Sequence, residues 1–217
     1  MKKIGLTLMG MGLLIIIGIL LVLRNNGTFT PKHNQPSVSG VATRSEKRTS
    51  QARHKRGKVL VVYMSHTGHT KAVARAIHRQ VGGDLYELKT REKYPQKYEK
   101  MLKIARKEQD QQRRPKLAGK LPDLKPYRTI VLGYPIWLDK NPMAINTFLN
   151  AYPTFKGKTI LPFTTSGSSG LGSSLTELKA NAKHAQFGKG LAITADELDD
   201  TSSLVKKWVQ TVGLTNN

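Results

Sequence analysis

The sequence predicts an α/β protein whose core is a doubly wound, five-stranded parallel sheet with helices on both faces. From residue 58 onward, short apolar segments alternate with helical patterns, the order expected of a parallel sheet. The segments after the first, third and fourth predicted strands are unusually rich in Gly, Ser, Thr or aromatic residues. In such sheets ligands bind beyond the carboxyl ends of the strands, where the winding reverses. The sequence therefore predicts one ligand site at that edge.

Apolar, largely β-branched or aliphatic runs mark the strands. After Lys58 the chain reads Val-Leu-Val-Val-Tyr-Met, and residues 129–134 have the composition of a buried strand. The predicted strands comprise residues 58–64, 84–88, 129–134, 159–163 and 191–194.

Helices are predicted from periodicity and from capping residues. Ala72, Val73, Ala76 and Ile77 would share one helical face. Asn141-Pro142 resembles an N-cap followed by proline in the first turn, and Ser174 to Glu177 has the spacing of a capping box. The predicted helices comprise residues 71–81, 94–110 and 200–212, with two more opening at Asn141 and Ser174.

The N-terminal region differs from the rest of the chain. Residues 4–23 carry no charge, and at about 1.5 Å per residue they would span a bilayer core of roughly 30 Å. No small-residue cleavage site follows them, which favours an uncleaved anchor over a signal peptide. We expect a transmembrane anchor over residues 1–24, a flexible basic linker over residues 25–56 and a folded domain over residues 57–217.

The charge pattern bears on location and partners. Lys2 and Lys3 favour a cytoplasmic N-terminus, whereas the basic residues of the linker oppose it. We expect a single-pass protein of the cell membrane with an extracytoplasmic domain, a cytoplasmic domain being the alternative. The net charge is +22, and residues 57–217 alone contain 26 Lys and Arg against 13 Asp and Glu. Anionic lipids or cell-wall polymers are candidate partners; no nucleic-acid motif is present.

Residues 65–70, Ser-His-Thr-Gly-His-Thr, follow the first strand and begin a helix. Hydroxyl groups, a glycine and free N–H groups at a helix start favour phosphate binding. The alternative is an ordinary strand-to-helix turn. His66 and His69 have no further ligand spaced with them, so no metal site is predicted.

The other two segments suggest a slot for a flat ring. Residues 133–140 contain Tyr134 and Trp137, and residues 164–172 are rich in Gly and Ser. Aromatic faces can stack on a heterocycle while glycine loops let N–H groups reach its edge. A phosphate and a flat ring together describe a mononucleotide, and flavin mononucleotide (FMN) suits the slot. The alternative for Trp137 is a core position, which is the expectation for Trp208.

The three segments, read together, resemble the flavodoxin family, in particular a bacterial flavodoxin-like subgroup. The matching stretches are Ser-His-Thr-Gly-His-Thr at 65–70, Gly-Tyr-Pro-Ile-Trp at 133–137 and Pro-Phe-Thr-Thr-Ser-Gly-Ser-Ser-Gly-Leu-Gly at 162–172, with Tyr94-Pro95 and Arg114-Pro115 also similar. The resemblance implies strand order 2-1-3-4-5 and noncovalently bound FMN. Leu138-Asp139 departs from the Trp-Gly usual in the subgroup.

The resemblance also implies which residues bind the cofactor. The phosphate would be held by Ser65, Thr67, Gly68, His69 and Thr70. One side of the ring would be flanked by Pro135, Ile136 and Trp137. Its other edge would be lined by Thr165, Ser166, Gly167, Ser168 and Gly170.

The expected function is therefore electron transfer by a membrane-tethered flavodoxin-like protein. The chain has no cysteine and no nucleophile elbow, so the chemistry would belong to the cofactor. Electrons would pass between a redox partner protein or a small donor and acceptor. The first alternative is an FMN-dependent NAD(P)H or quinone reductase. The second is a flavin-free module that adheres to anionic envelope polymers. The basic face formed by Lys93, Lys97, Lys100, Lys103 and Lys107 is expected either to be solvated or to dock an acidic partner.

Overall fold

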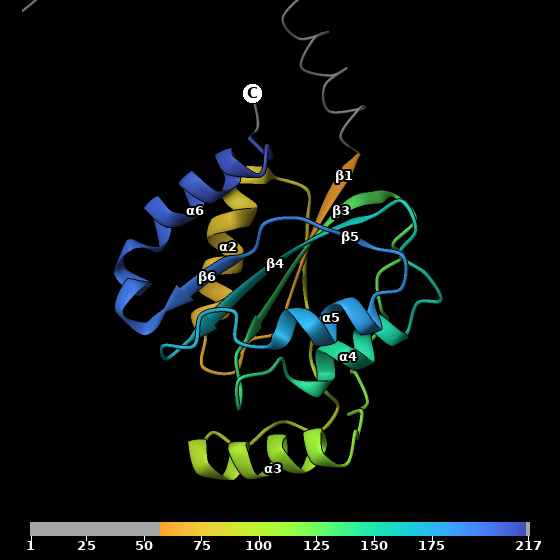
Figure 1. Ribbon diagram of the computed structural model, residues 1–217, viewed down its shortest axis with the longest axis vertical. Coiled ribbons are helices and arrows are strands. Elements are labelled where there is room, and N and C mark those ends of the chain that lie inside the picture. Colours follow the sequence, from red (N-terminus) through yellow and green to blue (C-terminus); the bar gives the residue numbers. More distant parts are fainter. Residues whose placement is uncertain (1–56, 216–217) are drawn as a thin grey trace, which may run out of the picture. The chain divides into compact units, whose positions relative to one another are not determined.

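The structure is a computed structural model in which residues 57–215 are described (Figure 1). The predicted anchor and linker over residues 1–56 lie outside the described residues. Between residues 57 and 215, no helix combines the length and apolar character needed to cross a membrane.

A parallel sheet forms the centre of the domain. Its strands are β1 (Lys58–Tyr63), β2 (Asp84–Glu87), β3 (Tyr127–Pro135), β4 (Thr159–Ser166), β5 (Gln186–Phe187) and β6 (Leu191–Thr194). They are arranged in the order β2-β1-β3-β4-β5, and β6 also pairs with β4. The predicted order 2-1-3-4-5 is confirmed.

The fifth position of the sheet is shared by two short strands, which corrects the prediction of five strands. β5 pairs with the beginning of β4, and β6 pairs with its end. Between them the chain passes very close to β4: a Cβ atom on Gly188 would lie 2.3 Å from Cδ2 of Leu161. A side chain at position 188 would therefore require Leu161 to move. The sequence prediction missed β5 because two residues form no apolar run.

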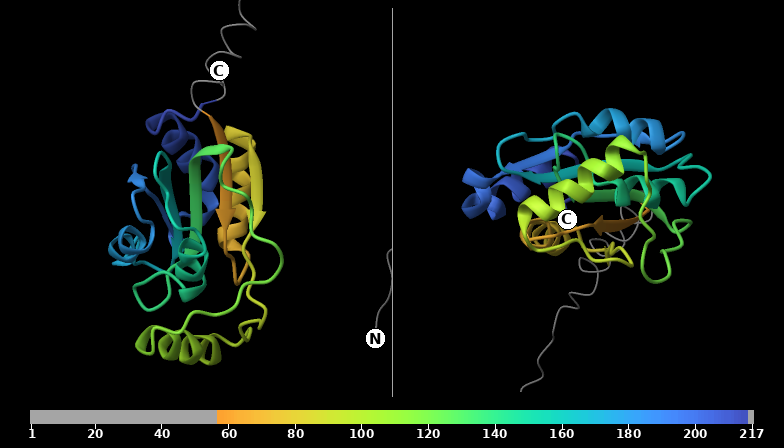
Figure 2. Two further views of the ribbon diagram at one scale, coloured as in Figure 1. Left: turned by 90° about the vertical axis from the view of Figure 1, so that its right-hand side faces the viewer. Right: turned by 90° about the horizontal axis from the view of Figure 1, so that it is seen from below.

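Helices cover both faces of the sheet (Figures 1 and 2). The helices are α2 (His69–Val81), α3 (Tyr98–Asp110), α4 (Met143–Asn150), α5 (Ser174–Asn181) and α6 (Thr201–Thr211). α2 and α6 enclose one core, which contains Val73, Ile77 and Trp208. α4 and α5 contribute to a second core, in which Phe148 is fully buried. Trp208 is a core residue, as expected from the sequence.

The helix α3 lies beyond the carboxyl ends of the strands, next to the edge where the ligand site is expected (Figure 1). It begins at Tyr98 rather than at the predicted Tyr94. Pro95 disfavours helical geometry at the residue before it, and Lys97 is extended at φ −66° and ψ 117°. Residues 94–97 therefore form a separate extended segment that leads into the helix.

The contact between β3 and β4 depends on a glycine. Gly133 is paired with Phe163, and a Cβ atom on Gly133 would lie 1.9 Å from Cζ of that phenyl ring. Phe163 is completely buried. The absence of a side chain at Gly133 thus allows the ring to fill the core directly below the site.

We expect Gly133→Ala to lower the free energy of unfolding by about 1–3 kcal/mol, because the methyl group overpacks a rigid core. Combining it with Phe163→Leu should recover part of the loss. Gly167→Ala is the matched control, since a Cβ atom there meets nothing within 4 Å. Urea unfolding monitored by circular dichroism measures all three variants. A Gly133→Ala protein as stable as the control would show that this contact is unimportant.

Candidate functional site

The strand register brings the three predicted segments to one edge of the sheet. Tyr63 is paired with Gly133, and Pro135 is paired with Thr165. The backbone continues this pattern beyond β3, where the Ile136 N–H donates to the Thr165 carbonyl at 2.9 Å. The predicted phosphate-binding residues and both groups of ring-binding residues therefore lie in adjacent loops.

Ser65 organises the first of these loops. Its hydroxyl oxygen accepts hydrogen bonds from the backbone N–H groups of Gly68 and Lys71, each at 3.2 Å. A serine hydroxyl has two acceptor positions and one donor, so its O–H group is left to donate to another acceptor. Gly68 has φ 102°, and a Cβ atom there would meet nothing within 4 Å. The loop is shaped around open space at the start of α2.

The start of α2 favours an anion. Its first turn contains no acidic residue and has no side-chain cap. The backbone N–H groups of His69 and Thr70 have no partner within the helix, and the helix dipole places partial positive charge at this end. The side chain of His69 lies 3.5 Å from the Thr67 hydroxyl. In the described part of the chain, His, Asp and Glu side chains form no metal-binding group. The loop has the donors that a phosphate group requires.

Thr70 joins the first loop to the end of β4. Its hydroxyl lies 2.7 Å from that of Thr165, and both residues are buried, at 1% and 7% exposure. Thr70 therefore connects the predicted phosphate loop to the predicted ring loop. Its hydroxyl is buried, whereas the Thr67 side chain is exposed, with its hydroxyl 3.5 Å from Nδ1 of His69.

The loop after β3 is a tight hairpin. Trp137 and Lys140 exchange backbone hydrogen bonds of 2.9 and 3.0 Å, and the two residues between them have φ 51° and 65°. Two positive φ values define a turn that normally selects Asn or Gly. Leu138 adopts this geometry at a cost of about 1–2 kcal/mol. The pair Leu138-Asp139, which departs from the related subgroup, thus forms the strained tip of the loop.

Trp137 is buried within this loop, with 5% of its surface exposed. Its indole packs edge-on against Tyr94, with ring centroids 4.9 Å apart, and against His66 at 5.8 Å. The core alternative considered for Trp137 therefore describes its packing, and a flavin stacked on its face would require the indole to move. Ile136 and Leu138 beside it are half-buried. Nε2 of His66 is buried without a hydrogen-bond partner among residues 57–215.

The loop after β4 is held as a compact turn. The Ser166 hydroxyl oxygen accepts from the Gly170 N–H at 3.0 Å, and the Thr164 hydroxyl donates to the Gly170 carbonyl at 2.8 Å. Gly167 and Ser168 are exposed at its tip. A Cβ atom on Gly167 would meet nothing within 4 Å, so the space beside this loop is also open.

A direct contact connects the two ring loops. The Asp139 carbonyl accepts hydrogen bonds from the N–H and the hydroxyl of Ser173, at 2.9 and 3.0 Å. A Cβ atom on Gly172 would lie 2.5 Å from the same carbonyl. Nearby, the ammonium group of Lys140 is 3.2 Å from the Glu177 carboxylate. The two sides of the predicted slot are therefore held at a fixed distance.

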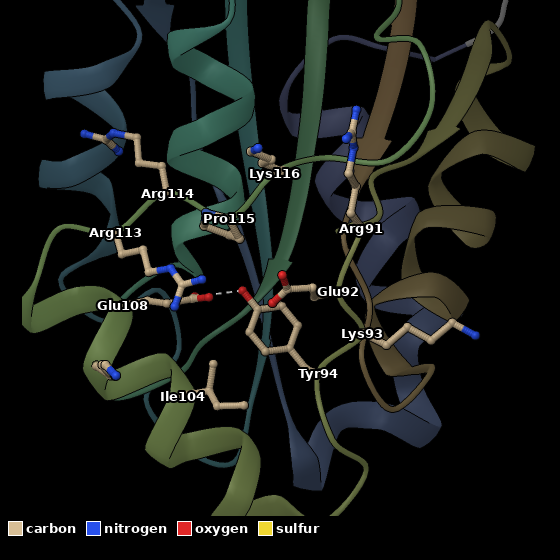
Figure 3. Close-up of a pocket in the computed structure, with 11 residues that line it drawn as sticks. Arg91, Glu92, Lys93, Tyr94, Ile104, Glu108, Arg113, Arg114, Pro115 and Lys116 are labelled. Atoms are coloured by element: carbon tan, nitrogen blue, oxygen red, sulfur yellow. Dashed lines mark hydrogen bonds between the residues drawn. The ribbon is translucent and has the colours of Figure 1, made fainter.

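Sequence reasoning did not place the segment between β2 and β3 at the site. There, residues from 91 to 116 enclose a pocket of about 690 Å³ (Figure 3). The Tyr94 hydroxyl donates to Oε2 of Glu108 at 2.8 Å across it. Burial raises the pKa of Glu108, although the Tyr94 hydrogen bond opposes this. The resemblance at Tyr94-Pro95 and Arg114-Pro115 was the available signal.

The Thr70–Thr165 link can be tested with isosteric substitutions. We expect Thr70→Val or Thr165→Val to lower the free energy of unfolding by about 1–3 kcal/mol, because each leaves a buried hydroxyl unpaired. The double variant should lose less free energy of unfolding than the two single variants lose in total. Thr211→Val, on the exposed side of α6, is the control. Strict additivity in urea unfolding would contradict the proposed coupling.

Comparison with known proteins agrees with this geometry. Residues 58–212 match the family model described as Flavodoxin. A candidate flavoprotein from Bacteroides eggerthii is 30% identical, with a TM-score of 0.61, over 72% of this chain and 98% of that one. A second, from Bacteroides uniformis, is 34% identical with a TM-score of 0.60, over 71% and 98%.

A flavoprotein from Lactobacillus acidophilus, solved in complex with FMN, is 23% identical with a TM-score of 0.56, over 67% of this chain and 99% of that chain. At that identity the similarity shows the fold alone. No curated protein matches the chain. The matched region accounts for 98% of each of the two Bacteroides chains. With the family model covering residues 58–212, the chain belongs to the flavodoxin family.

Proposed function

We propose that this protein binds FMN noncovalently and carries electrons between redox partners. The observation that carries the proposal is the loop from Ser65 to Thr70. There, a serine hydroxyl with both acceptor positions filled and the free N–H groups of α2 surround an open glycine. This arrangement suits a phosphate, and it adjoins the loop after β4, where Gly167 leaves space beside it.

Each loop would have a separate task. The phosphate would receive hydrogen bonds from Ser65 and Thr67 and from the N–H groups at the start of α2, helped by its dipole. The ring would lie between the hairpin after β3 and the turn containing Gly167, where backbone N–H groups can approach its edge. Because Trp137 is buried, Ile136 and Leu138 are the apolar residues of the hairpin that remain partly accessible.

Bound FMN would supply one- or two-electron transfer, and the chain would bind and orient it and limit the access of water. We further propose that residues 1–24 tether the domain to the cell membrane, with the domain on the extracytoplasmic side. The apolar run between residues 4 and 23 supports the tether.

Equilibrium binding of FMN to residues 57–217 tests the proposal, with quenching of flavin fluorescence as the readout. We expect a submicromolar dissociation constant. Ser65→Ala and Thr67→Ala should each weaken binding by about 10- to 100-fold, the effect of losing a hydrogen bond to a charged phosphate.

Thr211→Ala is the matched control, since it removes a hydroxyl from α6 on one side of the sheet, away from the three loops. Its dissociation constant should equal that of the unmodified domain. If FMN does not bind at about 100 μM, the flavin-free alternative would replace this proposal.

The excess of Lys and Arg over Asp and Glu in residues 57–217 should raise the reduction potential of the bound flavin. Reduction adds negative charge, and a positive charge about 10 Å away stabilises it by about 0.4 kcal/mol in a water-like medium, on the order of 20 mV. Salt screens this effect. Redox titration at increasing ionic strength should therefore give progressively more negative potentials, corrected for free FMN in the same series. A corrected potential that is independent of salt would contradict the prediction.

A further inference from the structure

The pocket between α3 and the segment after β2 has a strongly basic lining. Its cations come from α3 and from the segments before and after it. Antiparallel backbone contacts hold these two segments together: the Arg91 N–H donates to the Lys116 carbonyl at 2.8 Å, and Thr90 bridges to Leu117. The charged residues lining it are Arg91, Lys93, Lys107, Arg113, Arg114 and Lys116, with Glu92 and Glu108. Positive charge therefore exceeds negative charge around the pocket (Figure 3).

Among the described residues, no close ion pair involves these cations, although the charge of Arg113 acts on Glu108 and opposes the rise of its pKa. In residues 57–215, the ion pairs join Lys71 and Lys89 to Glu87, and Lys140 to Glu177. None of them involves a residue of the pocket. Like charges gathered around one pocket repel one another. An anion bound in the pocket would relieve this repulsion, so the lining favours an anionic ligand.

The two carboxylates do not cancel this charge. Glu108 is 6% exposed and accepts the hydrogen bond of Tyr94 at the floor of the pocket. Burial raises the pKa of its carboxyl group and opposes its ionisation. Glu92 is exposed, and its negative charge also helps to raise the pKa of Glu108. Arg113 extends towards the Tyr94–Glu108 pair, whereas Lys93 points away from it (Figure 3).

The pocket shares a wall with the proposed flavin site. The ring of Tyr94, which lines the pocket, packs against Trp137 with centroids 4.9 Å apart. Nearby on α3, Nε2 of Gln109 donates to the Trp137 carbonyl at 3.1 Å. The pocket is thus attached to the hairpin that would cover the flavin, although it is lined by different residues.

We propose that this pocket binds a small polyanion with phosphate or carboxylate groups, held by Arg113 and Lys116 beside the ring of Tyr94. Its volume of about 690 Å³ lies within the usual range for small-molecule sites. A role for this anion as a second ligand beside FMN rests on the proposed function. Binding of the anion in the pocket does not.

Calorimetric titration of the full chain, without FMN and at physiological ionic strength, tests the proposal. The probes are tripolyphosphate and citrate, and the tighter of the two identifies the anionic group. We expect saturable binding by at least one of them. The double substitution Arg113→Gln with Lys116→Gln should weaken it by about tenfold or more, because both residues would form charge-assisted hydrogen bonds with the anion.

The matched control is Lys206→Gln with Lys207→Gln on α6, which removes the same charge from a helix outside the pocket. It should change the affinity by less than about twofold, the effect expected of exposed and screened charges. Equal weakening by both double variants, or no saturable binding of either probe, would overturn the proposal. Thermal unfolding of each variant confirms that the fold is retained.

The two proposals fail separately. Weak binding of a probe at the loop from Ser65 to Thr70 would persist when Arg113 and Lys116 are replaced by Gln, and it would disappear in Ser65→Ala. Polyanion binding that depends on Arg113 and Lys116 in a protein that does not bind FMN would overturn only the flavin proposal. FMN binding without such polyanion binding would overturn only the pocket.

Discussion

The functional edge of this domain depends on one constraint: β1, β3 and β4 are parallel, adjacent and in register. Their carboxyl ends must therefore meet at one edge, whatever the loops contain. Gly133 makes this packing possible, because its missing side chain leaves room for the ring of Phe163. The Thr70–Thr165 hydrogen bond then joins the phosphate loop to the ring loop, and Asp139 joins the two ring loops through Ser173. The arrangement of the three loops therefore follows from core packing beneath this edge of the sheet and from the hydrogen bonds that join the loops.

The sequence predicted the features that local patterns encode. Apolar runs marked the strands that flank the site, and the composition of the three loops identified their shared edge. Local patterns could not reveal that β5 and β6 share one position beside β4, because that pairing depends on residues far apart in the sequence. Tyr94 was assigned to a helix because its spacing fitted, but Pro95 excludes that geometry. Trp137 fitted both a cofactor face and a core position, and its packing against Tyr94 and His66 could not be foreseen from local sequence.

The segment between β2 and β3 extends the site beyond the three loops. Seen as sequence, the lysines of α3 resemble a solvated face, and most of them are exposed. In the structure, Lys107 joins arginines from a distant segment around a concave surface, with Tyr94 as its inner wall. Leu138, on the adjoining hairpin, has a positive φ, which is strained for a leucine, and it lies at the same edge of the sheet. Strain and unpaired charge therefore concentrate where ligands are expected, which is typical of functional regions.

The central claim is that the loop from Ser65 to Thr70 holds the phosphate of FMN. Amide chemical shifts of the ¹⁵N-labelled domain, recorded with and without FMN, test it most directly. Hydrogen bonding to a phosphate should shift the amide protons of Thr67, His69 and Thr70 strongly downfield, with smaller changes near Gly167. Changes confined to the basic segment around Arg113 and Lys116, with the amides of α2 unmoved, would show that FMN binds in the pocket beside α3 and that the account of this loop is wrong.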